Sequence, residues 1–517
     1  MLTPYRPEPY VNFAEAEPRQ KILAALDGVR SQLGQKYALR LGTQPLHTPD
    51  TFASIMPASP KTIVGHMSKA TVEHANQAVK HAADAFKSWS GVDTETRARI
   101  LFKAAAIMRR RVYELSAWMC FEVSKSWLEA YADVCETIDF LDFYGREAIR
   151  LSGAHPVTAF PGEDNELRYM PLGVCVVIPP WNFPLAICAG MTSAALVTGN
   201  TVVLKPASTS PVIAAKMVEI FEQAGLPPGV LQFIPGPGGA IGDALVDHPQ
   251  TRLISFTGSK EIGLRVFERA AKIAPGQIWL KRTILEMGGK DCIVVDETTP
   301  DLDAAAEGVV AAAFGFQGQK CSACSRLIAH RDIYEPLLDR VVERAKLLTI
   351  GDTTTGENYF MGAVIDDKAF KKHNEYIDLG KREGRLVLGG AKTPSDGYFV
   401  PPTIFADVDR KARIACEEIF GPVLAVTKAA DFNDALAIAN GTEYGLTGAL
   451  YSADRFRIER ARHEFHVGNL YINRKCTGAL VDVQPFGGFN MSGTDSKAGG
   501  RDYLLLFLQG KSITERL

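Results

Sequence analysis

Between residues 173 and 270, short apolar and β-branched runs alternate with amphipathic segments of helical spacing. This alternation indicates a doubly wound parallel sheet, because two parallel strands need a crossover segment that packs on a face of the sheet. Ligands of such sheets bind beyond the carboxyl ends of the strands. The residues that follow the four strand-like runs, beginning at Pro179, Lys205, Pro235 and Thr257, are therefore expected to line one cleft.

The rest of the chain divides around this sheet. Residues 70–150 carry helical periodicity, and a second alternating series begins at DCIVVD (291–296) and ends near a glycine-rich stretch at 485–500. We predict an α/β fold with a Rossmann-type doubly wound domain, a second α/β domain, and a small β flap that serves oligomerisation. The expected boundaries are 1–153 with 171–284 for the first domain, 285–496 for the second, and 154–170 with 497–517 for the flap.

Composition limits the class of ligand. A chain of 517 residues is too long for one hydrophobic core, so two or three domains are expected. Lys and Arg total 57 against 59 Asp and Glu, and this balance favours neither nucleic acid, nor an anionic membrane, nor an acidic substrate. We expect a small-molecule ligand and no metal site.

The chain is predicted to be cytoplasmic. Its nine cysteines are an odd number without disulfide-like spacing, and the N-terminus resembles neither a signal peptide nor a transit peptide. The 36 uncharged residues between Arg168 and Lys205 are long enough to span a bilayer. Four prolines interrupt that stretch near its start, so a buried strand, loop, helix and strand is expected instead.

Four short motifs carry a family resemblance. They are Pro-Trp-Asn-Phe (180–183), Leu-Glu-Met-Gly-Gly-Lys (285–290), Gly-Gln-Lys-Cys-Ser-Ala (318–323) and Glu-Glu-Ile-Phe-Gly-Pro (417–422). Together, in this order and around an alternating β/α domain, they resemble the aldehyde dehydrogenase superfamily along nearly the whole chain. Within that superfamily, the stretches 319–323, 473–479, 484–488 and 492–494 are similar to the 1-pyrroline-5-carboxylate dehydrogenases, which oxidise glutamate semialdehyde to glutamate in proline breakdown.

The resemblance implies three catalytic residues. Cys321 matches the nucleophile whose thiolate makes the aldehyde carbon tetrahedral, so that hydride can leave. Asn182 matches the side-chain donor to the oxyanion, together with the Cys321 backbone N–H. Glu286 matches the base that activates water and releases a free carboxylate. Taken alone, these residues would be read as a buried apolar thiol, a turn residue and a surface glutamate, and Cys324 completes a Cys-x-x-Cys without a redox context.

The implied cofactor is NAD. The turn at 256–263 places small residues and backbone donors at a helix N-terminus, which suits a pyrophosphate although it is not the usual dinucleotide fingerprint. Ser208 stands where NAD-preferring members often carry an acidic residue that repels a 2′-phosphate, so we expect NADP to be tolerated. The resemblance and the turn together assign cofactor binding to Pro180, Trp181, Lys205, Ser208, Thr257, Gly258, Ser259, Gly263, Glu418 and Phe420.

The resemblance also implies how a glutamate-like substrate is held. The Ser322 hydroxyl and the backbone amides of Gly478 and Ala479 match the groups that bind the carboxylate, since small residues let an anion reach N–H groups. Phe183 and Phe486 match aromatic residues on either side of the aliphatic stem. Outside these motifs, the glycine would be an ordinary turn and each phenylalanine a core residue.

Lys320 has two interpretations. A cation beside a thiol favours the thiolate, so Lys320 either lowers the pKa of Cys321 or helps to position the substrate. The alternative is that its side chain points to solvent.

Other functions remain open at the level of sequence: another semialdehyde dehydrogenase, a catalytically silent relative, or a thiol hydrolase without redox chemistry. The filled nucleophile, donor and base positions argue against a catalytically silent relative.

We expect a homo-oligomer, dimeric or higher. The chain leaves no room for a preceding proline dehydrogenase barrel of about 250 residues. It therefore resembles the monofunctional form, for which transient contact with a separate proline dehydrogenase is an expectation.

Overall fold

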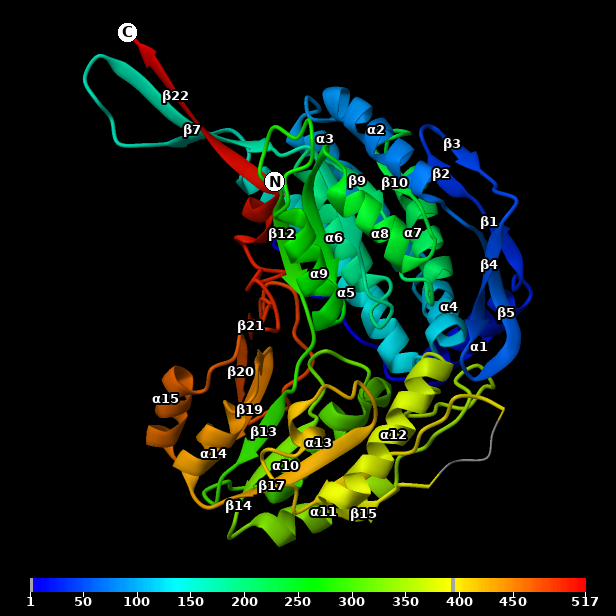
Figure 1. The fold of residues 1–517 in the computed structure, drawn as a ribbon, viewed down its shortest axis with the longest axis vertical. Coiled ribbons are helices and arrows are strands. Elements are labelled where there is room, and N and C mark those ends of the chain that lie inside the picture. The colour runs from blue at the N-terminus through cyan, green and yellow to red at the C-terminus, as the bar shows by residue number, and fades with distance from the viewer. Residues whose placement is uncertain (1–2, 392–395) are drawn as a thin grey trace.

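Two large, mostly parallel sheets organise the computed structural model, which describes residues 3–391 and 396–517 (Figure 1). The first sheet contains the four predicted strands and confirms the strand-and-helix alternation. Only β2 runs opposite to the other strands, so its pairings with β10 and β3 are the antiparallel ones. Its order is β12 (Arg282–Glu286), β11 (Thr251–Thr257), β8 (Val174–Ile178), β9 (Thr201–Leu204), β10 (Leu231–Phe233), β2 (Leu39–Leu41) and β3 (Gln44–Leu46).

The uncharged stretch after Arg168 forms the end of β7, then β8, a loop, α6 and β9, as predicted. Among the described residues, no helix is long and apolar enough to cross a membrane. Strand β9 and nearly all of α6 are buried, which is why this segment carries no charge. The helices that follow the strands of this sheet are α6 (Ala186–Val197), α7 (Pro211–Gln223), α8 (Gly238–Asp247) and α9 (Lys260–Ala270).

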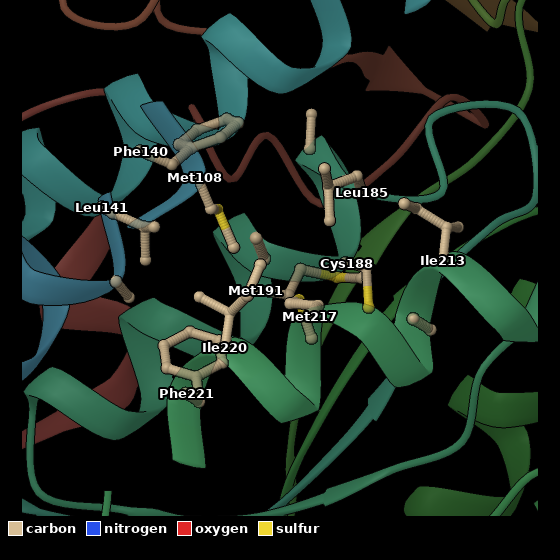
Figure 2. Close-up of a cluster of buried hydrophobic side chains, with 14 of the residues drawn as sticks. Met108, Phe140, Leu141, Leu185, Cys188, Met191, Ile213, Met217, Ile220 and Phe221 are labelled. Atoms are coloured by element: carbon tan, nitrogen blue, oxygen red, sulfur yellow. The ribbon is translucent and has the colours of Figure 1, made fainter. Parts of the chain in front are cut away.

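The N-terminal third adds helices and a three-stranded sheet to this domain. Helix α5 packs against α3, α4 and α6. Figure 2 shows side chains of α3, α5, α6 and α7 meeting in the largest hydrophobic core, among them Met108, Phe140, Met191 and Phe221. This packing fixes α6 and the loop before it. The elements are α1 (Ala16–Arg30), β1 (Gln35–Tyr37), β4 (Thr51–Met56), β5 (Ser59–Ser68), α2 (Val72–Trp89), α3 (Thr94–Arg110), α4 (Val112–Val123) and α5 (Trp127–Arg150).

The second sheet lies in the C-terminal half of the chain, below the first in Figure 1. Only its edge strand β15 is antiparallel. Its order is β15 (Arg385–Leu388), β16 (Thr403–Ala406), β17 (Val423–Ala429), β14 (Arg326–His330), β13 (Cys292–Val295), β19 (Thr447–Tyr451) and β20 (Asn469–Ile472). Its helices are α10 (Leu302–Phe314), α11 (Tyr334–Lys346), α12 (Asp367–Glu383), α13 (Arg413–Cys416), α14 (Phe432–Ala439) and α15 (Arg455–Glu464).

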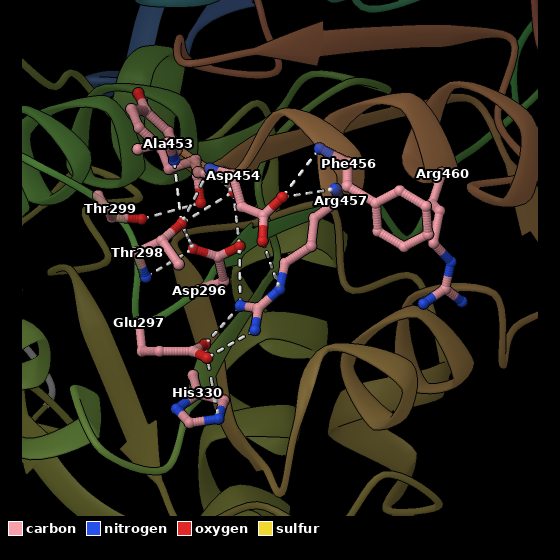
Figure 3. A network of polar contacts seen from close by, with 12 residues as sticks. Asp296, Glu297, Thr298, Thr299, His330, Ala453, Asp454, Phe456, Arg457 and Arg460 are labelled. Atoms are coloured by element: carbon pink, nitrogen blue, oxygen red, sulfur yellow. Dashed lines mark hydrogen bonds and ion pairs between the residues drawn. The ribbon is translucent and has the colours of Figure 1, made fainter.

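A polar network closes the carboxyl end of this second sheet (Figure 3). The Arg457 guanidinium donates to both carboxylate oxygens of Glu297 at 2.8 and 2.7 Å, and it lies 3.3 Å from Asp296. These hydrogen bonds lower the pKa of Glu297 to about 2. The network therefore ties α15 to the residues that follow β13.

The two sheets meet where the chain passes from one to the other. Strand β12 ends at Glu286, and β13 begins at Cys292 after only five residues. The loops at the carboxyl end of the first sheet therefore face the loops that enter the second (Figure 1). This junction is the place where the predicted motifs can come together.

A small antiparallel sheet extends from the body (Figure 1). It consists of β6 (Ala154–Pro156), β7 (Glu163–Pro171) and β22 (Leu508–Arg516), and β7 and β22 pair from Pro171 with Leu508 to Glu163 with Arg516. Residues 497–507, which we had assigned to this flap, lie against the body instead. The 3-10 helix η2 (Tyr503–Phe507) buries three apolar side chains in the large core: Tyr503, Leu504 and Phe507.

Candidate active site

Cys321 lies at the junction of the two sheets, after a strained turn. The 3-10 segment η1 (Gly315–Gly318) holds Phe316 and Gln317 at φ 49° and 57°, in the left-handed region. Such residues cost on the order of 1–3 kcal/mol each and persist only where their surroundings fix them. The Gln317 side-chain amide donates to the backbone carbonyls of Ser124 and Ala363 at 3.1 and 2.8 Å, which fixes the turn.

Two cavities share Cys321 in their walls. One has a volume of about 290 Å³ and also borders Glu286, and the other, of about 420 Å³, borders Asn182. The sequence-predicted nucleophile, oxyanion donor and base are therefore brought together around one thiol. Their catalytic roles are argued below from this placement.

Asn182 is held directly against the nucleophile segment. It is 4% exposed, and its Nδ2 donates to the Gln319 carbonyl at 3.0 Å. A side-chain amide has two N–H donors, so this bond leaves one N–H for an oxyanion. The position is maintained from the other side as well, because Asp133 accepts from the backbone N–H of Ala186, the first residue of α6, at 2.6 Å.

Glu286 ends β12 and is half-buried, with its Oε2 atom enclosed. Burial raises the pKa of this carboxyl to about 7, although a hydrogen bond from the Ser496 hydroxyl to Oε1, 2.5 Å long, acts in the opposite direction. Its Oε2 is buried and has no hydrogen-bond partner among the described residues. A carboxyl group with a pKa near neutrality can both accept and release a proton, as a general base requires.

Cys321 is a neutral thiol in this environment. Burial raises its pKa, and the carboxyl groups of Asp291, Glu286 and Glu418 raise it further. The Lys320 ammonium is paired with Oε1 of Glu129 at 2.6 Å rather than with the thiol. Lys320 also does not point to solvent, since only 12% of its side chain is exposed and it borders the 290 Å³ cavity.

All six residues predicted to hold the substrate line the cavity of about 290 Å³. Gly478 is part of the cavity wall and adopts φ 81°, a backbone conformation that favours glycine. Cys324 lies outside this cavity and is buried in the second core. The predicted residues on the wall are Phe183, Lys320, Ser322, Gly478, Ala479 and Phe486.

One face of α5 forms a wall that the sequence reasoning missed. Its residues recur at spacings of three and four, and two of them are acidic in an otherwise apolar face. That pattern was visible in the sequence, but it equally describes a helix packed on a core. The residues of this face are Glu129, Ala132, Glu136, Phe140 and Tyr144. Tyr10 and Leu128 border the same cavity.

The second cavity is lined by seven of the ten predicted cofactor residues: Pro180, Trp181, Thr257, Gly258, Ser259, Glu418 and Phe420. The other three lie off its wall. Lys205 directly follows β9, and its ammonium donates to the Pro206 carbonyl at 3.2 Å; the Ser208 hydroxyl donates to the Gly236 carbonyl at 3.0 Å. Gly263 lies in α9, where an added Cβ would come within 2.5 Å of Met287 Sδ.

The chemistry of this cavity fits a dinucleotide. Ser259 is the N-cap of α9, and its hydroxyl accepts from the Ile262 N–H; the first-turn N–H groups that it does not cap are available to a pyrophosphate. Burial lowers the pKa of Lys205 to about 8. A ligand hydroxyl that accepted a hydrogen bond from this buried ammonium would offset part of the cost of its desolvation. Glu418 accepts from the Gly289 N–H at 2.9 Å, and the Trp181 and Phe420 rings meet edge to face at 5.5 Å.

Comparison with known proteins gives full-length matches. A family model described as "Aldehyde dehydrogenase family" matches residues 46–513. The 1-pyrroline-5-carboxylate dehydrogenase of Geobacillus kaustophilus (strain HTA426) is 58% identical over 515 residues, and each chain is covered completely.

Among solved structures, the 1-pyrroline-5-carboxylate dehydrogenase from Thermus with bound NAD is 51% identical with a TM-score of 0.98, and 100% of both chains is covered. Proline utilization A from Bdellovibrio bacteriovorus is 43% identical with a TM-score of 0.97, and the match covers 99% of this chain and 53% of that one. These matches confirm the predicted fold class.

Proposed function

Because the chain belongs to the aldehyde dehydrogenase family, as the sequence resemblance predicted, we propose that it oxidises L-glutamate 5-semialdehyde to L-glutamate with NAD. The semialdehyde is in equilibrium with 1-pyrroline-5-carboxylate. One observation carries the proposal: Cys321 lies where a cavity lined by the predicted substrate residues meets a cavity lined by the predicted cofactor residues. The names of the full-length relatives support the same substrate and cofactor.

In the oxidative half of the reaction, the Cys321 thiol first releases its proton to solvent; the thiolate then forms a bond to the aldehyde carbon, and the carbonyl electron pair moves to oxygen. The Asn182 side chain and the Cys321 backbone N–H donate to this oxyanion, so the charge develops against donors that are already in place. When bound, NAD accepts the hydride that the tetrahedral carbon releases. The sulfur is left in a thioester.

In the hydrolytic half, Glu286 takes a proton from water, and the water oxygen bonds to the thioester carbon. The carbon–sulfur bond breaks, sulfur leaves as thiolate, and the product is a free carboxylate. A buried carboxyl with a pKa of about 7 suits this role, because it is partly ionised at neutral pH and basic enough to take the proton.

The substrate cavity suits a short chain that ends in a carboxylate. Ser322 and the backbone of Gly478 and Ala479 provide small groups and N–H donors at one part of the wall. The aromatic rings of Phe183 and Phe486 provide apolar area for a methylene stem. Another semialdehyde dehydrogenase would share the thiol and the base and differ only in these anchors.

The test compares substrates and variants. Wild type should turn over glutamate semialdehyde with NAD far more efficiently than succinate semialdehyde or propanal, and Cys321→Ala should be inactive with all three. Ser322→Ala should raise the KM for glutamate semialdehyde and leave propanal oxidation unchanged. Equal kcat/KM for the three aldehydes would overturn the substrate assignment, and cofactor-independent ester hydrolysis without NADH formation would overturn the redox chemistry.

Assembly, partner and location are inferred from three separate features. The β6–β7–β22 sheet projects from the body and exposes Phe160 and Met170 among charged residues, a surface that suits a subunit contact, so we infer a homo-oligomer. The match to about half of a protein named for proline utilization supports transient contact with a proline dehydrogenase. All nine cysteines are free thiols, which suits a cytoplasmic enzyme.

A further inference from the structure

The glycine-rich segment 485–500 forms a closed loop over Glu286. Of its residues, only Phe486 has a role in the proposed function. Phe486 and Ala498 exchange backbone hydrogen bonds of 2.9 and 2.7 Å, which close the loop. The loop is also bonded to both neighbours of Glu286: Met287 N–H donates to the Ser492 carbonyl, and Thr494 N–H donates to the Leu285 carbonyl, at 2.8 and 2.9 Å. The backbone that carries the base is therefore fixed by this loop.

The side chain of Glu286 is held by the same loop. The Ser496 hydroxyl donates to Oε1 at 2.5 Å, and Ser496 is only 5% exposed. A buried hydrogen bond to a carboxylate is among the stronger kinds, because its partner is charged and water does not compete. Oε2, which has no partner among the described residues, is the oxygen left to accept from a water.

The loop is strained on both sides of this serine. Asp495 and Lys497 adopt φ 52° and 47°, so a left-handed residue stands on each side of Ser496. The Lys497 ammonium donates to the carbonyls of Gly468 and Gly487, both at 2.8 Å, and holds that conformation. Strain of this kind is retained where surrounding contacts fix it, often at functional sites. Here its geometric effect is to direct the serine hydroxyl at the carboxylate.

Close approach of the loop depends on a residue without a side chain. A Cβ added at Gly487 would lie 2.7 Å from the Lys497 backbone nitrogen and 3.2 Å from Glu286 Oε1. Gly487 directly follows Phe486, which borders the substrate cavity. One loop thus presents an aromatic ring to the substrate and a hydroxyl to the base.

We propose that Ser496 is a positioning residue for the hydrolytic step: its hydroxyl fixes Oε1 of Glu286, so that Oε2 takes the proton from the attacking water. The proposal rests on the proposed function. In that step the water O–H bond breaks toward Oε2, the oxygen bonds to the thioester carbon, and sulfur leaves with the electron pair of the carbon–sulfur bond. Ser496 keeps its proton throughout.

The hydrogen bond also sets the acidity of the base. Donation to the ionised form lowers a carboxyl pKa, so removing the hydroxyl raises the pKa of Glu286 above its present value of about 7. The other titratable groups that act on it are the Lys497 ammonium, which lowers its pKa, and the Cys321 thiol and Tyr503 hydroxyl, whose own pKa values it raises.

The experiment compares Ser496→Ala, Ser496→Thr and Thr494→Val by rapid mixing with glutamate semialdehyde and NAD from pH 6 to 9. Thr494 is a matched control, because its hydroxyl is on the same loop but contacts the backbone of Leu285. Ser496→Ala should keep the first-turnover burst of NADH and slow the steady state about tenfold. The acid limb of its pH profile should move up by about one unit, equivalent to ~1.4 kcal/mol. Ser496→Thr should restore the wild-type limb.

The outcomes separate this proposal from the proposed function. No NADH from the wild type would refute the function itself, whereas a wild-type burst with an unshifted acid limb in Ser496→Ala would refute the positioning role. Loss of the burst in Ser496→Ala would also count against it. As a second measurement, Glu286→Gln and Glu286→Gln with Ser496→Ala should hydrolyse the thioester, followed by mass spectrometry, at equal rates. A further slowing in the double variant would overturn the proposal.

Discussion

A fully buried ion pair supports the wall shared by the substrate and oxyanion loops. Lys125 and Asp133 both have completely buried side chains, and Lys125 Nζ lies 2.7 Å from Asp133 Oδ2. The same ammonium lies 4.0 Å from the centre of the Phe183 ring and 4.7 Å from that of Phe316. One cation therefore contacts the residue after the oxyanion donor and the strained turn before the nucleophile.

We predict that Lys125→Met lowers both stability and activity. The substitution keeps the length and apolar contacts of the side chain but leaves the Asp133 carboxylate buried without its counter-charge. Removing one partner of a buried pair costs about 3–5 kcal/mol of unfolding free energy. Misplacement of the reacting groups should also reduce kcat/KM by on the order of a hundredfold. Urea unfolding followed by tryptophan fluorescence measures the first effect, since Trp118 and Trp127 lie in the same core.

The double variant Lys125→Met with Asp133→Asn separates the two effects. Asparagine keeps an oxygen for the Ala186 N–H and removes the unpaired charge, so more than half of the lost stability should return. Activity should stay low, because the cation between the two rings is still missing. Equal unfolding midpoints for the single and double variants would refute the electrostatic reasoning, and wild-type kcat/KM in the single variant would refute the positioning role.

Three further predictions concern the site itself. Asn182→Ala should lower kcat/KM by about 10²–10³-fold in initial-rate assays, because one oxyanion donor is lost, and a loss below fivefold would contradict that role. Ser208→Glu should reduce kcat/KM with NADP at least about tenfold while NAD changes little, since a carboxylate repels the 2′-phosphate; unchanged NADP efficiency would count against it. Single-turnover thioester hydrolysis should be half-maximal near pH 7 and fall about tenfold for each unit below it, because Glu286 must be ionised. A profile that stays flat down to pH 5 would exclude Glu286 as the base.

Local sequence patterns predicted the first sheet well, because its strands are buried on both faces and are followed by helices at regular intervals. The C-terminal tail was harder to predict from the sequence. Residues 497–507 looked like part of the flap, but the apolar run at Tyr503–Phe507 is a 3-10 helix buried in the core. Only β22 leaves the body, and no residue before Leu508 marks the change, since burial there depends on packing with distant segments.

The residues of the site likewise divide into those that the sequence reveals and those that only the fold reveals. Residues that carry reactive groups within short motifs, such as Cys321 and Glu286, could be named from the sequence. Ser496 and Lys125 could not, since a serine in a polar loop and a lysine near a helix start are ordinary surface residues by sequence. The partner of Ser496 lies 210 positions away, and Phe183 is separated from Lys125 by one helix and three strands. Only the tertiary fold brings them into contact.

The coupling between the nucleophile and the base gives this arrangement a chemical logic. Glu286 raises the pKa of the Cys321 thiol, and the interaction is reciprocal, so a thiolate disfavours ionisation of the carboxyl. Attack on the aldehyde needs the thiolate, and a neutral Glu286 makes that state easier to reach. Once the sulfur is in the thioester it carries no charge, and the carboxyl ionises more readily, when a base is needed to take a proton from water. The ionisation of Glu286 is therefore coupled to the covalent state of Cys321: it is opposed while the sulfur is a thiolate, and that opposition is gone once the sulfur is in the thioester.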